Sequence, residues 1–155
     1  MHAGGKPPFT ASIRTATEAD LDAIMEIEEG EFPEDAWSRA TMASELTNPN
    51  GRYLVAVDEG EVLGYAGVRV GGEQADVQTI AVRPMARRRG LGRALVLELL
   101  DEGRRRGATS AFLEVRADNL GAQTLYAQLG FTAFTIRPHY YPGGVDAIAM
   151  HKDLA

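Results

Sequence analysis

The chain has 155 residues, of which 45% are hydrophobic and 25% charged, as expected for one ordinary globular domain. It contains no cysteine, which excludes disulfides, a thiol nucleophile and thiolate metal sites, and it has no run of about 18 apolar residues that would span a membrane. The formal net charge of −6 disfavours general nucleic-acid binding. This charge either keeps the protein soluble or suits a basic acceptor such as a Lys- and Arg-rich peptide.

The N-terminal segment, residues 1–11, is predicted to be a flexible tail. It contains two glycines and two prolines in its first ten residues and lacks the apolar stretch of a signal peptide. No linker or internal repeat interrupts the remaining sequence, so residues 12–155 are expected to form a single domain. We expect a cytoplasmic protein, which fits the lack of cysteine, and a monomer.

The first third of the chain is predicted to form a short strand, Ser12–Thr15, and two helices. Thr17 has the chemistry of an N-cap, and apolar residues follow it at helical spacing. Ser38 caps a second helix that runs to about Leu46. The segment between the two helices, Phe32–Trp37, is broken by a proline and is expected to be irregular.

The middle of the chain changes to β-forming residues separated by turn residues, which predicts a meander. A long amphipathic helix and further strands follow, and an irregular segment, Arg137–Gly144, joins the last two strands. This order predicts a mixed α/β architecture around one sheet. The predicted elements are strands at Arg52–Val57, Val62–Val70 and Ala75–Val82, a helix at Gly90–Arg106, a strand at Thr109–Val115, a helix capped by Asn119, and an antiparallel pair at Phe131–Ile136 and Asp146–His151.

The sharpest local signal is a basic, glycine-containing run between a predicted strand and the long helix. The first amides of a helix lack internal partners and carry partial positive charge, and glycine lets a phosphate approach the backbone closely. Arginine side chains add charged donors. The run therefore predicts a pyrophosphate-binding turn, and the alternative is a basic surface turn before a helix. Its residues are Arg87, Arg88, Arg89, Gly90, Leu91, Gly92 and Arg93.

Two other phosphate-binding motifs do not fit this run. The dinucleotide motif G-x-G-x-x-G requires a third glycine where Leu95 stands. The P-loop requires a Gly-Lys-Ser/Thr triplet, which does not occur in the sequence. A nicotinamide-dependent or kinase-type enzyme is therefore disfavoured.

The pattern Arg87-x-x-Gly90-x-Gly92 resembles the coenzyme-binding signature of the GNAT acetyltransferases, (Gln/Arg)-x-x-Gly-x-(Gly/Ala). The resemblance covers residues 12–153 and is strongest after Thr79. The segments that resemble the second half of the family are Leu113–Asn119, Leu125-Tyr126 and Leu129–Phe131. The segments that resemble its RimI branch, the alanine N-α-acetyltransferases of ribosomal proteins, are Arg137–Pro142 and Asp146–Met150.

The resemblance implies the GNAT fold and acetyl-CoA as cosubstrate. This fold has a central, mostly antiparallel sheet with a splayed pair of parallel strands, here Ala75–Val82 and Thr109–Val115, and helices on both faces. Pantetheine would lie in the gap between that pair, and no residue spacing suggests a metal site. The resemblance assigns the coenzyme to Ile80, Ala81 and Val82, to Arg87, Arg88, Arg89, Gly90, Leu91, Gly92 and Arg93, and to Asn119 and Tyr126.

Acetyl transfer to an amine needs a neutral amine. An α-amine has a pKa of about 7.7–8.0 and a lysine amine one of about 10.4, so an α-amine needs only mild help from a carboxylate. Glu114 is the candidate base, because it lies in the middle of a predicted central strand, where glutamate is unusual. The alternative is an exposed or ion-paired glutamate, for example with Arg116, whereas the RimI branch favours the base.

The departing thiolate must in turn receive a proton, and Tyr126 is the candidate acid. A tyrosine pKa of about 10 lies just above that of a thiol, about 8.5. The alternative is packing on the helix, but many family members place a tyrosine here for this role. Tyr141 is a second candidate acid and His139 a weak alternative base. The expected reaction is direct transfer in a ternary complex without an acyl-enzyme.

Two irregular segments are expected to line the acceptor side, because binding residues gather on loops. Glu34 and Asp35 would meet a basic peptide, and Trp37 would contact it, with a solvated loop and ordinary packing as the alternatives. Tyr140 and Tyr141 would hold the backbone or the first side chain of the peptide.

Three functions follow from these predictions. The favoured one is acetylation of the N-terminal alanine of a small-subunit ribosomal protein, which presents a basic peptide. The second is the same chemistry on a lysine side chain or a small amine. The third is a coenzyme-binding regulator without catalysis, against which the presence of Glu114 and Tyr126 argues.

Overall fold

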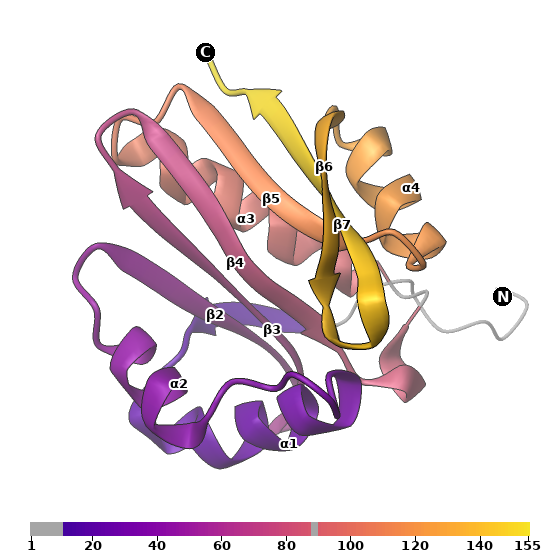
Figure 1. Cartoon of the computed structure of the whole chain (residues 1–155). Coiled ribbons are helices and arrows are strands. Elements are labelled where there is room, and N and C mark those ends of the chain that lie inside the picture. Colours follow the sequence, from indigo (N-terminus) through magenta and orange to yellow (C-terminus); the bar gives the residue numbers. More distant parts are fainter. Residues whose placement is uncertain (1–10, 88–89) are drawn as a thin grey trace, which may run out of the picture.

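The computed structural model describes residues 11–87 and 90–155, which form one seven-stranded sheet with helices on both faces (Figure 1). The strands are β1 Ser12–Thr15, β2 Gly51–Asp58, β3 Glu61–Gly71, β4 Gln74–Val82, β5 Ser110–Arg116, β6 Thr132–Tyr141 and β7 Val145–Asp153. The helices are α1 Leu21–Glu31, α2 Arg39–Leu46, α3 Leu91–Arg105 and α4 Leu120–Gln128, with short 3-10 turns at Glu18–Asp20, Pro84–Ala86 and Pro142–Gly144.

The predicted helix caps form as local contacts. The Asp20 carboxylate accepts from the Thr17 N–H, Oδ2 to N 2.8 Å, and a 3-10 turn at Glu18–Asp20 leads into α1. The Ser38 side chain accepts from the Thr41 N–H ahead of α2. Asn119 accepts from the Ala122 N–H at the start of α4. Each cap satisfies an amide that has no partner inside its own helix.

The strand order in the sheet is β1-β2-β3-β4-β5-β7-β6, and the only parallel pairing among the described residues is that of β4 with β5. Helices α3 and α4 pack on one face, which we call the back face, around Leu95, Leu99 and Phe131. Helices α1 and α2 pack on the opposite, front face around Ile24 and Met42. The expected mixed α/β fold, with a splayed parallel pair and helices on both faces, is confirmed.

The front face is covered over only part of its width. Helix α2 packs on β2 and α1 packs on β3 and β4, and in Figure 1 neither helix is drawn across β5, β7 or β6. Side chains on the front of these three strands, such as Phe112, Glu114 and His151, are therefore partly or fully exposed. Of the predicted site residues, Glu114, Tyr140 and Tyr141 lie on this uncovered half of the sheet.

The predicted loop at Arg137–Gly144 is wrong in its first part, because β6 continues to Tyr141. β6 is an edge strand, where Pro138 is tolerated since its missing N–H breaks no central ladder. The pairing with β7 is interrupted between Arg137 and Tyr141, and His139 adopts a left-handed conformation with φ 54°. Tyr140 and Tyr141 therefore stand on a bulged strand end rather than on a loop.

Candidate active site

A cleft opens where β4 and β5 separate. The two strands pair only through Gln74–Asp76 and Ser110–Phe112. Gln78 has no register partner on β3, because Thr79 pairs with Gly67 and Val77 with Val68. This β-bulge bends β4 locally, and beyond Asp76 its edge has no partner from β5. The backbone of the second half of β4 is therefore open toward the cleft.

The cleft has two adjoining parts that share residues of β4, β5 and the segment after α1. The inner part, about 220 Å³, reaches Ile80, Asn119 and Tyr126. The outer part, about 640 Å³, extends over the front of the sheet to Phe112 and Phe134. The residues that line both parts are Asp35, Trp37, Val77, Gln78, Leu113, Glu114 and Tyr141.

Glu114 stands at the junction of the two parts of the cleft. The β5 alternation that the sequence predicts holds, since Leu113 and Val115 are buried on the back face and Glu114 faces the front. Its side chain is 29% exposed and its Oε2 forms an ion pair with Arg137 Nε at 2.7 Å. The ion-pair partner is thus Arg137, whereas Arg116 pairs with Asp118 at 3.0 Å.

Arg137 reaches Glu114 across an intervening strand. β7 lies between β6 and β5, and its Ala149 is the register partner of Glu114, while Ala147 is that of Arg137. Alanine methyl groups leave room for the arginine side chain to pass over β7. The Arg137 guanidinium also lies 5.7 Å from the centre of the Tyr140 ring. Arg137 was not among the predicted site residues, and no local sequence pattern could have found this contact.

Three tyrosines line the cleft, and two of them, Tyr126 and Tyr141, are the predicted proton donors. Burial, with a smaller effect of Tyr141, raises the pKa of Tyr126 to about 12. Burial and then the charge of Glu114 raise the pKa of Tyr141 to about 12. The Tyr141 ring also carries the Arg116 guanidinium 5.2 Å from its centre. Both hydroxyls therefore stay protonated at neutral pH and are available as donors.

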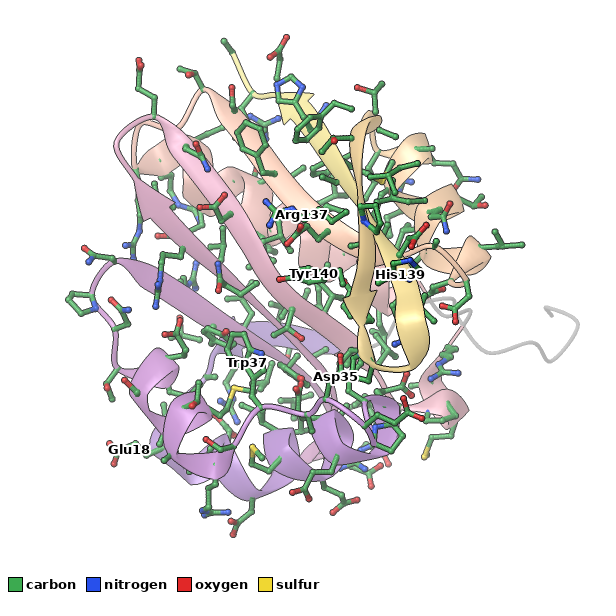
Figure 2. The ribbon with its side chains drawn as sticks, viewed as in Figure 1. Glu18, Asp35, Trp37, Arg137, His139 and Tyr140 are labelled. Carbon is green, nitrogen blue, oxygen red and sulfur yellow. The ribbon has the colours of Figure 1, made fainter. Side chains whose placement is uncertain are left out.

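The predicted acceptor segment, Phe32–Trp37, connects α1 and α2 and lies against the cleft. Figure 2 shows Asp35 and Trp37 on this segment, below Arg137 and Tyr140 from β6. Asp35 and Trp37 line the cleft, whereas Glu34 is exposed and lines neither part of it. The structure thus brings together four of the five predicted acceptor residues.

Glu28 anchors this segment from the buried side of α1. It is 2% exposed and lines the inner cleft. Its Oε2 accepts from the Trp37 N–H at 2.9 Å, and its Oε1 accepts from the Tyr65 hydroxyl. The sequence offered one signal that was missed, namely a glutamate four residues after Ile24 on the apolar stripe of α1.

Of the predicted pyrophosphate turn, Arg88 and Arg89 fall outside the described residues, and Arg87 adjoins the cleft through its contact with Glu31. Gly90 has φ 78°, which suits glycine, and directly precedes α3. Arg87 is ion-paired with Glu31, which lines the inner cleft. Arg93 is exposed, and the Leu91 side chain is buried, so only the backbone of Leu91 can serve a ligand.

The remaining predicted coenzyme residues differ in placement. Ile80 lines the inner cleft, and both Ile80 and Val82 pack against the back-face core. The Ala81 side chain is buried against the α1 and α2 core, so only its backbone can serve. Asn119 lines the cleft, but its Oδ1 accepts from the Ala122 N–H and caps α4.

Comparisons with known proteins decide the family. The sequence pattern of the acetyltransferase (GNAT) family matches residues 21–131. The chain belongs to the GNAT acetyltransferase family. The ribosomal protein bS18-alanine N-acetyltransferase of Escherichia coli K12 is 41% identical over 146 residues, covering 90% of this chain and 95% of that protein. The N-alpha-acetyltransferase RimI of Mycobacterium tuberculosis is 38% identical and covers 92% of each chain. The predicted GNAT acetyltransferase class, with its resemblance to RimI, is confirmed.

Other similarities support the same family. An uncharacterized protein of Mycobacterium leprae is 40% identical over 94% of this chain, and the match spans only 43% of that longer protein. The crystal structure of the Escherichia coli ribosomal-protein-S18-alanine N-acetyltransferase has a TM-score of 0.86 and 36% identity, covering 94% of this chain and 95% of that one. YncA of Salmonella typhimurium, whose structure was solved with its cofactor acetyl-CoA, shares the fold with a TM-score of 0.81 and 24% identity over 94% of this chain and 95% of that one.

In residues 11–87 and 90–155, no three His, Asp or Glu side chains gather where they could hold a metal ion. None of the helices in these ranges is both long and apolar enough to cross a membrane.

Proposed function

We propose that this GNAT protein transfers an acetyl group from acetyl-CoA to the N-terminal α-amine of a protein, with the N-terminal alanine of a small-subunit ribosomal protein as its main acceptor. The observation that carries this proposal is Glu114, held by Arg137 at the mouth of the cleft between the splayed strands. The relatives named as ribosomal-protein alanine N-acetyltransferases, about 40% identical over most of the chain, support the acceptor.

The cleft fits the coenzyme in two respects. The edge of β4 beyond Asp76 has no partner from β5, so its backbone groups near Ile80 and Val82 can receive the amides of an extended arm. The left-handed Gly90 and the first amides of α3 suit a pyrophosphate, with Arg87, Arg88, Arg89 and Arg93 as charged donors. When bound, acetyl-CoA supplies the acetyl group as a thioester.

Glu114 would accept a proton from the acceptor amine. Arg137 occupies Oε2, while Oε1 remains for the amine or a bridging water. A carboxylate is a sufficient base for an α-amine with a pKa of about 7.7–8.0, but a weak one for a lysine near 10.4. The neutral amine can then attack the acetyl carbon while the bond from that carbon to sulfur breaks, which is direct transfer in a ternary complex.

Tyr126 would return a proton to the departing sulfur. It lies on α4 and lines the inner part of the cleft, on the coenzyme side of Glu114. Its raised pKa keeps the hydroxyl protonated, so it can donate throughout the neutral range. Tyr141 lines both parts of the cleft and is better placed to contact the acceptor amine.

The outer cleft would hold the acceptor peptide. Asp35 and Glu114 give it negative charge, and Trp37, Tyr140 and Tyr141 give it aromatic walls. This chemistry suits a basic N-terminal segment. We expect the enzyme to act as a monomer in the cytoplasm and without binding nucleic acid directly.

The test is acetylation of a short peptide that begins with alanine and is rich in Arg and Lys. Mass spectrometry after incubation with acetyl-CoA should find one acetyl group on the α-amine. A peptide whose α-amine is blocked but whose lysines are free is the matched control. Acetylation of the blocked peptide or of polyamines alone would overturn the N-terminal acceptor, and no acetylation with any amine would overturn the enzyme.

A further inference from the structure

The outer cleft continues past Glu114 to a group of side chains that the proposed chemistry does not use. Asp76 on β4 and Phe112 on β5 are register partners in the short parallel pairing. Ala75 and Ala111, the residues just before them, belong to the back-face core, so Asp76 and Phe112 both face the front. A carboxylate and an aromatic ring thus stand side by side at the far end of the cleft.

Two strands on the other side complete this group. His151 on β7 is the register partner of Phe112, with ring centroids 5.2 Å apart. Phe134 on β6 meets Phe112 edge to face, with centroids 6.0 Å apart. Phe134 has no register partner on β7, because a bulge separates Ala133 from Thr135. A bulge can redirect a side chain, and here the bulge turns the Phe134 ring to the front face. Phe134 is 58% exposed there.

The charges around this group are unevenly paired. The Arg137 cation is paired with Glu114, and His151 lies 3.3 Å from Asp153. Asp76 accepts from the Gln74 side-chain amide at 2.8 Å, and Arg69, its register partner on β3, is ion-paired with Glu45 at 2.5 Å. Within residues 11–87 and 90–155, Asp76 thus takes part in no ion pair and stands beside the Phe112 ring. A guanidinium or ammonium group is the ligand that an aromatic face and a carboxylate favour together.

We propose that Asp76, Phe112 and Phe134 form a subsite for a cationic side chain, arginine above all, at the third residue of the acceptor peptide. This inference rests on the proposed function, which places the α-amine at Glu114. Phe112 precedes Glu114 by two positions on the same face of β5, which is about 6.4–6.8 Å along a strand. An extended peptide covers the same distance between its first and third residues, and those two side chains point the same way.

The test uses two sets of peptides that begin with alanine. In the first set, arginine at the third residue is compared with citrulline, which has the same shape without the charge. In the second set, the arginine stands at position two, four or six instead. We expect kcat/KM to be about fivefold to tenfold higher for arginine than for citrulline at position three, with smaller differences elsewhere. The preference should shrink as salt is added.

Variants of the chain assign the effect to the subsite. Asp76→Asn and Phe112→Leu should each lower kcat/KM for the arginine peptide several-fold, mainly through KM, and leave the citrulline peptide nearly unchanged. Asp76→Lys should reverse the preference toward a glutamate at position three. Asp101→Asn, which removes one exposed carboxylate on α3, is the matched control and should change neither peptide.

The outcomes separate the two proposals. Equal kcat/KM for arginine and citrulline at position three, with both peptides acetylated on the α-amine, would overturn the subsite and leave the proposed function standing. An arginine preference that peaks at another position or survives in Asp76→Asn would also overturn the subsite. Failure to acetylate every peptide would overturn the proposed function itself.

Discussion

The carboxylates of the covered and the uncovered parts of the molecule are held in different ways. Glu102, on α3 and next to Arg52 of β2, accepts from three arginines, with Arg52, Arg105 and Arg106 at 3.0, 2.9 and 2.7 Å. Glu114, on the uncovered front of β5, is ion-paired with Arg137 through Oε2 and lines the cleft. A carboxylate held through both oxygens stabilises the fold, whereas one that is paired through a single oxygen and lines a cleft is available for proton transfer.

The largest effect is expected for Glu114→Gln. The amide keeps the shape and can still accept from Arg137, but it cannot take a proton, so kcat/KM for an alanine-initiated peptide should fall about a hundredfold to ten-thousandfold. Thermal unfolding should be almost unchanged, because Glu114 is ion-paired with Arg137 alone among the described residues. A variant that unfolds well below the wild type, or that retains full activity, would contradict the assignment of Glu114 to chemistry.

Tyr126→Phe is expected to come next, with kcat lowered roughly a hundredfold. Because burial raises the pKa of Tyr126 to about 12, the wild-type hydroxyl remains protonated up to about pH 11. The wild-type rate should therefore rise with pH as the acceptor amine loses its proton, and it should show no decline between pH 8 and pH 10. Tyr141→Phe is the comparison variant, and a larger loss there would assign the donor to Tyr141.

Glu102→Gln should behave in the opposite way to Glu114→Gln, because it should lower the free energy of unfolding and leave kcat/KM unchanged. Burial alone would raise the pKa of Glu102, but hydrogen bonds from Arg106, Arg105 and Arg52 lower that pKa to about 2. A lowered pKa stabilises the fold above the ordinary value of about 4.5, and that stability is lost as the pH falls toward 2. The variant should lose roughly 2–3 kcal/mol at pH 7, about a 30- to 160-fold change in the folding equilibrium.

Urea unfolding of Glu102→Gln and wild type at pH 7 and pH 3 measures this effect, with kcat/KM as the second readout. The difference between the two proteins should shrink at pH 3. A difference that is as large at pH 3 as at pH 7 would mean that the ionised carboxylate is not the source of the stability.

The smallest of these effects is expected for Arg137→Gln, about tenfold in kcat/KM. The neutral amide no longer holds the Glu114 carboxylate by charge, so kcat should fall while KM stays nearly unchanged. Arg137→Lys should recover part of the activity because it restores the charge. An equally large loss when Arg137→Gln is added to Glu114→Gln would show that Arg137 does not act through Glu114.

Local chemistry explains which predictions from the sequence succeeded. Caps at Ser38 and Asn119 depend on a few neighbouring residues, and both formed as predicted. The front-facing position of Glu114 followed from alternation along one strand. The helix before Phe32 was also predicted, although it begins with a 3-10 turn rather than directly at Thr17.

Contacts between distant strands account for what was missed. Arg137 meets Glu114 only because β7 is inserted between β5 and β6, an order that no local pattern specifies. The bulges at Gln78 and Phe134 depend on pairing with another strand, so the sequence of one strand cannot reveal them. Tyr141 belongs to a strand because the edge position of β6 accommodates Pro138, which local reasoning takes as a strand end.

Gln78, which has no register partner on β3, shifts the alternation of side chains along β4 by one residue. Val77 and Ile80 are three positions apart, yet both pack toward α3, which strict alternation would forbid. Ahead of the bulge the odd-numbered side chains belong to the back-face core, and after it the even-numbered ones do. Deletion of Gln78 would restore strict alternation along β4. The side chains at one end of the strand would then point to the opposite face of the sheet from the one they occupy now. The inner wall of the cleft, which includes Ile80, therefore depends on the presence of a residue at position 78.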